Sequence, residues 1–497
     1  MMEIELKLAS TNEALSQFKE LVLPQLTQAT TSRELKLVNH YFDTPDQALG
    51  KRRMGCRVRI EGKHIEQTIK TQGQVVGGLH QRPEYNVAIE QEQPNLRLFP
   101  ADIWANDFAL DEINQALELQ FTTNFTRSEF LFQHGDAKVE LVFDQGEVRL
   151  EKESLPINEI ELELKQGNPS ALFDLADLIA DAMPVRISNV TKAARGYQLI
   201  NKALPKTHKL PDFLPLNGDE STEAGLCKAI EFALSHWQHH EQVYQQSQHL
   251  KALNEIAFSI ELLLQSVSLY LPVLQCPELL NLHKQLLVLT QQWQWQEDLT
   301  CIRQLRARQG PFSRKVPKHQ MLMSYLNGRR EGLLVTQSPE QLLMASESSR
   351  VQLAASRILV EKPWREQGTG SDIAVMKHAK GWLSQGWQTV MQSLPRNHAM
   401  DHHHYLSLEI LLRQTLLNGF LLADLFKENR GKFRAPWLDL LAGLDEIKSL
   451  IFLKDVLDEV DIEDKATMLS WINEKLSNVV TVMERSRAVA MQAEVYW

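Results

Sequence analysis

The chain has 497 residues, 43% of them hydrophobic and 23% charged, and its formal net charge is −10. This composition excludes a disordered chain and a basic nucleic-acid coat protein, and the length predicts two to four domains. Nearly all of the acidic excess falls in the first 200 residues, so we expect two modules of different character.

The cysteines Cys56, Cys227, Cys276 and Cys301 are scattered without a CxxC pair, which argues against a disulfide framework and a zinc ribbon. No basic and apolar leader opens the chain, and no stretch approaches the roughly 20 apolar residues of a membrane span. We therefore expect a cytoplasmic protein with no membrane or nucleic-acid partner and no obligate protein partner.

The first predicted element is a strand over residues 2–9 in which charged and apolar side chains alternate strictly. Glu3, Glu5 and Lys7 share one face of it, because residues two apart in a strand point to the same side. Two carboxylates and an ammonium on one strand face can hold a divalent cation and a polyanion together.

Residues 1–203 are predicted to be mostly β-structure. Alternation and turn signals indicate further strands at 36–43, 55–61, 64–71, 83–90, 125–134, 137–144 and 157–165. Helices are expected near 11–24, with Thr11 as its cap, and near 169–183, opened by Asn168 and Pro169. Gly77 and Gly78 are expected in a hairpin or loop, since no P-loop lysine follows them.

Like charges repeat on one face of several of these strands. Arg57 and Arg59 flank an apolar residue, and Glu161 and Glu163 do the same. A solvated sheet face is the ordinary explanation for one strand, but like charges side by side repel unless a ligand of opposite sign lies between them. Eight antiparallel strands closed into a barrel, with their apolar faces outward under helices, would turn the charged faces into a tunnel suited to a short polyphosphate.

The chemistry of these side chains fits such a ligand. Arginine and lysine bind phosphate oxygens, and carboxylates hold Mg²⁺ while leaving positions for water and phosphate. The fold class expected is α+β, with a closed antiparallel eight-stranded β-barrel and flanking helices followed by an all-α helical bundle.

The ordered set of charged residues resembles the CYTH superfamily, the triphosphate tunnel metalloenzymes. The Glu-x-Glu-x-Lys start is the family signature, and the later elements follow in the family's order: Tyr41-Phe42-Asp43-Thr44, Arg57 with Arg59, Lys70, Arg82 with Glu84, Arg127, Glu140 with Asp144, Glu161 with Glu163, and Lys192. The segment 77–86 is similar to bacterial two-domain inorganic triphosphatases, in which CYTH precedes a helical CHAD domain.

The resemblance implies roles for individual residues. Glu3 and Glu5 would bind the metal, Mg²⁺ or Mn²⁺, with Glu161 and Glu163 as partners across the tunnel. Glu140 and Asp144 would orient the water or serve a second metal, with Lys7 as a further catalytic residue. The expected phosphate-binding residues are Lys7, Arg57, Arg59, Lys70, Arg82, Arg127 and Lys192. Glu84, Lys138 and Glu159 are expected elsewhere in the tunnel, and Glu159 shares the face of Glu161 and Glu163, so the operative pair could be shifted by two.

Residues 204–218 carry three prolines and a glycine and predict a stiff linker. Residues 219–497 are predicted to be helical, and the resemblance implies a CHAD domain there. Helices are expected at 221–246, 249–271, 277–308, 338–362, 371–392, 402–427, 435–453 and 463–490, with breaks that include Pro436.

Two histidine groups and one weakly basic helix stand out in this half. His236 and His240 share a predicted helix face around Trp237, with His239 beside them. Because no third ligand or acid is evident, packing or surface placement is expected. His402-His403-His404 is expected at a solvated helix start. CHAD domains are read as polyphosphate-binding modules, but the helix after His249 has one lysine and no arginine, so a scaffold or docking role stands beside polyphosphate binding.

The function predicted from the sequence is metal-dependent hydrolysis of inorganic triphosphate to pyrophosphate and phosphate. Two enzymatic alternatives share the tunnel: an organic triphosphatase acting on thiamine triphosphate or a nucleotide, and a class IV-type adenylyl cyclase. A polyphosphate-binding protein without activity is the non-enzymatic alternative. The paired carboxylates argue against it, because an anion receptor gains nothing from acids in its site.

Overall fold

The computed structural model describes residues 2–26, 29–307, 309–312, 320–367, 370–395 and 398–497. They form two compact units, the first made of Met1–Lys206, Gln245–Gln248 and Glu340–Lys362, and the second of Thr207–Tyr244, His249–Pro339 and Pro363–Trp497. The segment 340–362, which the sequence analysis assigned to the helical domain, therefore counts with the first unit. Position 308, the end of one predicted helix, lies outside the described residues.

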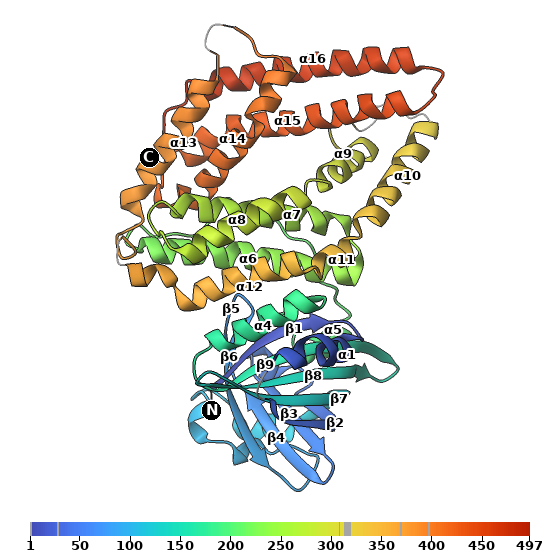
Figure 1. The fold of residues 1–497 in the computed structure, drawn as a ribbon, viewed down its shortest axis with the longest axis vertical. Helices are drawn as coiled ribbons and strands as arrows, with labels where there is room; N and C mark the ends of the chain where they lie inside the picture. The colour runs from blue at the N-terminus through green and yellow to red at the C-terminus, as the bar shows by residue number, and fades with distance from the viewer. Residues whose placement is uncertain (1, 27–28, 308, 313–319, 368–369, 396–397) are drawn as a thin grey trace. The chain divides into compact units, whose positions relative to one another are not determined.

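Antiparallel strands of the first unit close into a barrel (Figure 1). The order around it is β1 (Met2–Ser10), β9 (Glu153–Gln166), β8 (Ala137–Leu150), β7 (Glu118–His134), β2 (Ala29–Asp43), β3 (Gly55–Glu61), β4 (His64–Lys70) and β6 (Leu79–Ala88), and pairing of β6 with β1 completes the circle. Short strands β5 (Gln74–Val76) and β10 (Val185–Ile187) extend the sheet. The predicted eight-stranded barrel is confirmed.

The apolar faces of the strands point outward, as predicted. Leu6 of β1 and Phe143 of β8 pack in one outer core with Phe18 and with Phe173 of helix α4 (Ser170–Ala182). On the other side, Val58 of β3 belongs to a second outer core beneath the segment that follows β6. Because side chains alternate along a strand, the charged residues between these apolar ones face the barrel interior.

The helices of the first unit are shorter than predicted. In place of one helix over 11–24, α1 (Ala14–Gln17) continues as a π-turn (Phe18–Val22) and a 3₁₀ turn (Leu23–Gln25). Thr11 is not the cap: its backbone carbonyl accepts a hydrogen bond from the N–H of Ala14. Pro169 does open α4 as predicted. The unit also contains α2 (Ala48–Lys51), α3 (Leu110–Gln115), α5 (Lys192–Asn201) and the 3₁₀ turns Leu96–Leu98 and Ala101–Ile103.

Helix α12 (Ser346–Glu361) belongs to the first unit although it is far along the chain. Arg357 of α12 pairs with Asp174 of α4, and the Ser356 hydroxyl donates to the carbonyl of Gly77. Gly77 and Gly78 form the predicted hairpin turn between β5 and β6, and both have positive φ (58° and 101°), a conformation that favours glycine.

The second unit is helical, as predicted (Figure 1). Its helices are α6 (Thr222–Ser247), α7 (Leu250–Tyr270), α8 (Pro277–Gln292), α9 (Gln296–Arg306), α10 (Gln320–Gln337), α13 (Met376–Ser393), α14 (His402–Leu422), α15 (Arg430–Glu459) and α16 (Lys465–Ala490), and α11 (Pro339–Leu343) precedes α12. The predicted helix 277–308 is thus two helices, and α10 was not predicted. A 3₁₀ turn (Ala423–Leu425) follows α14, and another (Pro363–Gln367) follows α12.

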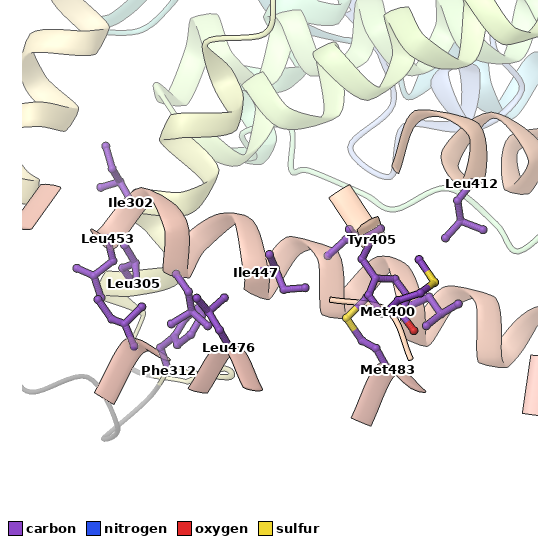
Figure 2. Close-up of a cluster of buried hydrophobic side chains, with 14 of the residues drawn as sticks. Ile302, Leu305, Phe312, Met400, Tyr405, Leu412, Ile447, Leu453, Leu476 and Met483 are labelled. Atoms are coloured by element: carbon purple, nitrogen blue, oxygen red, sulfur yellow. The ribbon is translucent and has the colours of Figure 1, made fainter. Parts of the chain in front are cut away.

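Pro436 lies inside α15 and does not end a helix, contrary to the prediction. The adjacent Trp437 and the nearby Phe433 are buried in the core of the second unit, and this burial offsets the hydrogen bond that proline removes. Figure 2 shows part of that core, where Met400, Tyr405 and Met483 lie together.

Two helices of the described chain are long and apolar enough to cross a membrane by length and composition, Leu250–Tyr270 and His402–Leu425. The expectation that no stretch comes close to this was therefore wrong. However, 67% and 56% of their most apolar windows are buried inside the protein, and core helices of a bundle meet the same criteria. These two helices are weak evidence for a membrane span.

Candidate active site

The barrel encloses a cavity of about 380 Å³ whose wall is mostly charged. The basic side chains of the lining are Arg33, Arg57, Arg59, Lys70, Arg82, Arg127, Lys165 and Lys192, and the acidic ones are Glu3, Glu5, Glu61, Glu66, Glu84, Glu129, Glu140, Glu161 and Glu163. Both signs therefore share one small volume, and how they are sorted decides what the cavity can bind.

Three carboxylates form a row across adjacent strands. Glu5 of β1 lies directly opposite Glu163 of β9, and Glu163 lies directly opposite Glu140 of β8. Directly opposite residues have Cβ atoms about 5 Å apart, and like charges there repel. We call Glu5, Glu163 and Glu140 the acid row. Lys165 neutralises one end of it, with its Nζ 2.7 Å from Glu163 and 3.1 Å from Glu140.

This register corrects one prediction. Glu161 and Glu163 were expected on the opposite wall from Glu3 and Glu5, but β9 is the direct neighbour of β1. The period-two pattern of a strand specifies which face a residue occupies and says nothing of which strands pair. The acidic positions therefore form one wall.

Burial perturbs the acids of this wall. It raises the pKa of Glu3 to about 7; Glu5 and Glu84 add to the effect, and Lys70, 2.6 Å away, opposes it. Burial also raises the pKa of Glu163, despite Lys165, and the charges of Glu140 and Glu5 add to it. Such carboxylates lack sufficient positive charge nearby. A divalent cation held by oxygen ligands would supply it, so the residues present fit Mg²⁺ or Mn²⁺.

Behind the acid row lies a buried network of ion pairs around Lys192. Thr191 caps α5, and the Nζ of Lys192, its first residue, is 2.6 Å from Asp144, 2.5 Å from Glu159 and 3.0 Å from Glu161. These three carboxylates lie close enough together to hold a metal ion. The ammonium of Lys192 contacts all three, so positive charge already compensates them in part.

Two more cations of this network contact Glu161. Lys7 is 2.6 Å from Glu161, and Arg127 is 2.7 Å from Asp144 and 2.8 Å from Glu161. Burial disfavours the charged forms of Glu161 and Asp144. Nevertheless, Lys192, Lys7 and Arg127 hold the pKa of Glu161 well below its usual range. Arg127 and Lys192 likewise lower the pKa of Asp144. These groups stay ionised and fix one another's positions.

The opposite part of the wall carries an excess of positive charge. Arg57 and Arg59 point into the cavity from β3. Among the described residues no carboxylate lies within ion-pair distance of Arg59, whose Nε donates to Asn39 at 2.9 Å. Burial lowers the pKa of Arg59 to about 9, and the charges of Arg57 and Arg127 add to it. A half-buried guanidinium beside two other guanidinium groups is a site for an anion.

Comparison with known proteins assigns the N-terminal part to a family. Residues 1–197 match the CYTH domain. This part of the chain is a CYTH domain. Over 231 residues the chain is 38% identical to an inorganic triphosphatase of Haemophilus influenzae, a stretch that covers 44% of this chain and 62% of that protein. The chain thus spans less than two thirds of that relative's length.

Solved structures resemble the CYTH domain weakly. A protein from Hippeastrum, described as having a dominant triphosphatase activity, is 15% identical with a TM-score of 0.31 and covers 39% of this chain and 95% of that one. An inorganic triphosphatase is 17% identical with a TM-score of 0.16 and covers 34% of this chain and 77% of that one. These TM-scores are low, and no conclusion about this chain rests on them.

The CYTH domain brings most of the predicted site residues to its cavity. Those that line it are Glu3, Glu5, Arg57, Arg59, Lys70, Arg82, Glu84, Arg127, Glu140, Glu161, Glu163 and Lys192. Lys7, Asp144 and Glu159 are buried behind the lining. Lys138, expected in the tunnel, is exposed beside a β-bulge at the start of β8 and lies outside the lining.

Other lining residues were missed by the sequence analysis. Arg33 lies on β2, which was predicted to begin at residue 36 but begins at Ala29. The signal that could have found it is the alternation that places Arg33 on the same strand face as Leu35 and Leu37. His80, which lines the cavity, was missed as well, and so was Arg195, which lies outside the lining and 2.7 Å from Glu159. His80 lies directly opposite Glu5 on β6, and no sequence pattern pairs those strands.

Proposed function

We propose that the CYTH domain hydrolyses inorganic triphosphate to pyrophosphate and phosphate with the help of a divalent cation, Mg²⁺ or Mn²⁺. The observation that carries the proposal is the division of the cavity wall. One part presents the acid row, and another presents Arg59, which has no carboxylate within ion-pair distance in the described part of the chain. A metal–polyphosphate complex carries both signs that such a wall requires.

The phosphate groups would be bound by basic side chains of several strands. The proposed set is Arg57, Arg59, Lys70, Arg82, Arg127 and Lys192, all of which line the cavity. Arg127 and Lys192 are held rigidly by Asp144, so they need no rearrangement to meet the developing charge of the transferred phosphoryl group. Lys7 would act through Glu161, to which it is bound.

The metal would be held by Glu3, Glu5 and Glu163, each of which has one lysine within ion-pair distance in the described part of the chain: Lys70, Lys7 and Lys165, respectively. Glu161, also proposed from the sequence, lines the cavity but already contacts three cations, so it would contribute least. When bound, a divalent cation neutralises phosphate oxygens and polarises water. Glu140, at the end of the acid row, is the proposed group that orients the attacking water and accepts its proton.

The substrate class follows from the small, charged cavity and from the relative. An inorganic triphosphate has no base or heterocycle to accommodate, and the apolar lining is confined to Leu35, Leu37, Tyr41 and Ala193, with Gly55, in the described cavity. The similar Haemophilus influenzae protein is an inorganic triphosphatase. A cytoplasmic location and a CHAD-type helical domain that binds polyphosphate belong to the same proposal.

The experiment measures phosphate release by the full chain from triphosphate, ATP, thiamine triphosphate and long polyphosphate, with and without Mg²⁺. We expect Mg²⁺-dependent release from triphosphate, with equal amounts of pyrophosphate and phosphate. Glu5→Gln should abolish it, because the amide cannot replace a charged oxygen ligand. Glu34→Gln is the matched control, since Glu34 is an exposed residue of β2.

Faster turnover of ATP or thiamine triphosphate than of triphosphate would contradict the substrate assignment. Tight polyphosphate binding without phosphate release would instead support a receptor. Unchanged turnover in Glu5→Gln would overturn the placement of the metal on β1.

A further inference from the structure

The second unit contains a cluster of histidines that the proposed triphosphatase chemistry does not use. His236, His239 and His240 lie on α6, and His208 comes from the irregular segment that precedes it. The ring centre of His208 is 4.9 Å from that of His236, 4.5 Å from that of His239 and 4.9 Å from that of His240. The third ligand that the sequence analysis lacked is therefore present, supplied by a residue 28 positions before His236.

The ring nitrogens converge closely enough to share one ion. One ligand nitrogen from each of His208, His239 and His240 lies within 4.8 Å of the others. The Nδ1 of His236 is 3.3 Å from the Nε2 of His208. Two nitrogens bound to a tetrahedral zinc ion are about 3.4 Å apart. The backbone and side chains are thus already near a metal-binding arrangement.

Neighbouring groups orient two of these rings. The Nδ1 of His240 donates to the backbone carbonyl of His236, 2.7 Å away. Its Nε2 therefore carries the lone pair and accepts a hydrogen bond from the backbone N–H of His208 at 3.3 Å, a long contact that a metal ion at Nε2 would replace. The Nε2 of His236 lies 3.1 Å from the carboxylate of Glu255 on α7, and it donates there, so the Nδ1 facing His208 keeps its lone pair. Carbonyl and carboxylate partners of this kind orient metal-binding histidines.

We propose that His208, His239 and His240 bind a transition-metal ion of the zinc class, with His236, oriented by Glu255, as the fourth nitrogen ligand. Imidazole ligands select zinc, nickel and copper over Mg²⁺, which prefers oxygen. The site is separate from the acid row in its residues, its ligand type and its metal.

The histidine cluster is open to solvent on one side, and a metal bound there would link two segments of the chain. His208 is exposed and His239 half-exposed, whereas His240 is buried. The ion would therefore enter from solvent and tie the irregular segment around His208 to α6. Because the unfolded chain does not hold the four rings together, binding would add to the stability of this segment.

The experiment uses the untagged full chain in excess Mg²⁺, which occupies oxygen sites, and titrates it with Co²⁺ as a spectroscopic substitute for zinc. Cobalt held by four nitrogens in a tetrahedron absorbs visible light far more strongly than cobalt held by oxygens in an octahedron. We expect one strongly absorbing equivalent, displaced by added Zn²⁺, and a rise in the melting temperature with Zn²⁺ that a chelator reverses.

Three variants test the ligands. His208→Gln and His239→Gln lie at accessible positions, so they should fold and should lower the Co²⁺ absorption and the Zn²⁺ affinity at least tenfold. His403→Gln is the matched control, because His403 is an exposed histidine of another cluster, at the start of α14. A weak, octahedral-type spectrum in the wild type, or an unchanged Zn²⁺ affinity in His208→Gln and His239→Gln, would overturn the proposal.

Discussion

Arg127 and Asp144 lie directly opposite each other on β7 and β8, joined by two hydrogen bonds of 2.8 and 2.7 Å from the guanidinium to the carboxylate. Asp144 is fully buried, and its Oδ2 is also 2.6 Å from the Nζ of Lys192. One carboxylate thus holds two cations of the cavity wall. Its role in the proposed mechanism is to position them, since it does not line the cavity itself.

The first prediction concerns this pair. Asp144→Asn removes the charge that holds Arg127 and Lys192, leaving two buried cations poorly compensated. Breaking a buried ion pair from one side typically costs about 3–5 kcal/mol of stability. We expect a lower melting temperature of the CYTH unit, together with a strong loss of triphosphate turnover, measured by thermal unfolding and by phosphate release.

The matched control is the exposed pair Arg97 and Asp111, whose atoms are 2.7 Å apart at the surface of the same unit. Asp111→Asn should cost no more than about 1 kcal/mol, because solvent screens such pairs. An equal loss of stability in both variants would show that burial does not strengthen the Asp144 interaction.

The second prediction separates the candidate metal carboxylates on β9. Glu163→Gln alters a residue that lines the cavity, so it should leave the fold intact and raise the Mg²⁺ concentration needed for half-maximal turnover at least tenfold. Glu159→Gln alters a residue buried against Lys192 and Arg195, so it should mainly lower the melting temperature. If the Mg²⁺ requirement shifts only in Glu159→Gln, the operative carboxylate is the deeper one.

The third prediction concerns pH and α4. Burial raises the pKa of Asp177 to about 6; Asp181 and Asp174 add to this, and Arg357 and Arg350 oppose it. The folded state therefore binds the proton more tightly than the unfolded state, whose pKa is about 3.9. The stability contributed by the protonated form is present below about pH 4 and is lost as the pH rises through about 6.

Asp177→Asn removes this dependence, because asparagine stays neutral. The variant should be more stable than the wild type at pH 7, by on the order of 1 kcal/mol after solvent screening, and should show no gain at pH 4. Hydrogen exchange of the α4 amides at the two pH values measures the difference locally. An equal gain at both pH values would contradict the pKa account.

The fourth prediction concerns the close approach of α5 to β7. A Cβ atom added at Gly196 would lie 2.2 Å from the ring of Phe121, which stacks on Tyr41 with ring centres 4.6 Å apart. Gly196→Ala should push α5 away from the barrel, costing about 1–3 kcal/mol, and should displace Lys192 at the start of α5. We therefore expect both stability and turnover to fall.

A helical glycine without neighbours provides the comparison. Apart from its chain neighbours and the backbone of its own helix, no described heavy atom lies within 4 Å of a Cβ added at Gly381 in α13. Gly381→Ala should therefore stabilise the helix slightly, by about 0.5–1 kcal/mol. A tolerated Gly196→Ala would show that α5 can shift without disturbing the cavity.

The barrel could be predicted because its signal is local. Alternation along β1, β3, β4 and β9 places charged residues on one face and apolar residues on the other. Closure of the sheet with the apolar faces outward buries the apolar side chains under helices and gathers the charged ones around an interior. The helical half could be predicted from its period of three to four residues, but its ends could not, since packing decides them. Pro436 shows this, because the buried Trp437 and Phe433 keep α15 intact through it.

The residues that line the cavity could be predicted where the strand that carries them was predicted, and were missed elsewhere. Arg33 was missed because β2 begins before the predicted strand. Lys138 shares the strand face of Glu140, but it lies at the start of β8, is exposed and is outside the cavity lining. Both residues lie towards strand ends, and a period-two pattern does not specify where a strand begins or how far the cavity extends along it.

By itself, the sequence determined that charged residues of both signs share the interior faces of a barrel, because a strand's alternation is a property of neighbouring residues. Only the tertiary structure decided that Glu5, Glu163 and Glu140 form one row and that Lys192 lies among Asp144, Glu159 and Glu161. It also brought His208 to the histidines of α6. These relationships join residues distant in the chain, and strand pairing and packing, which no local pattern encodes, set them.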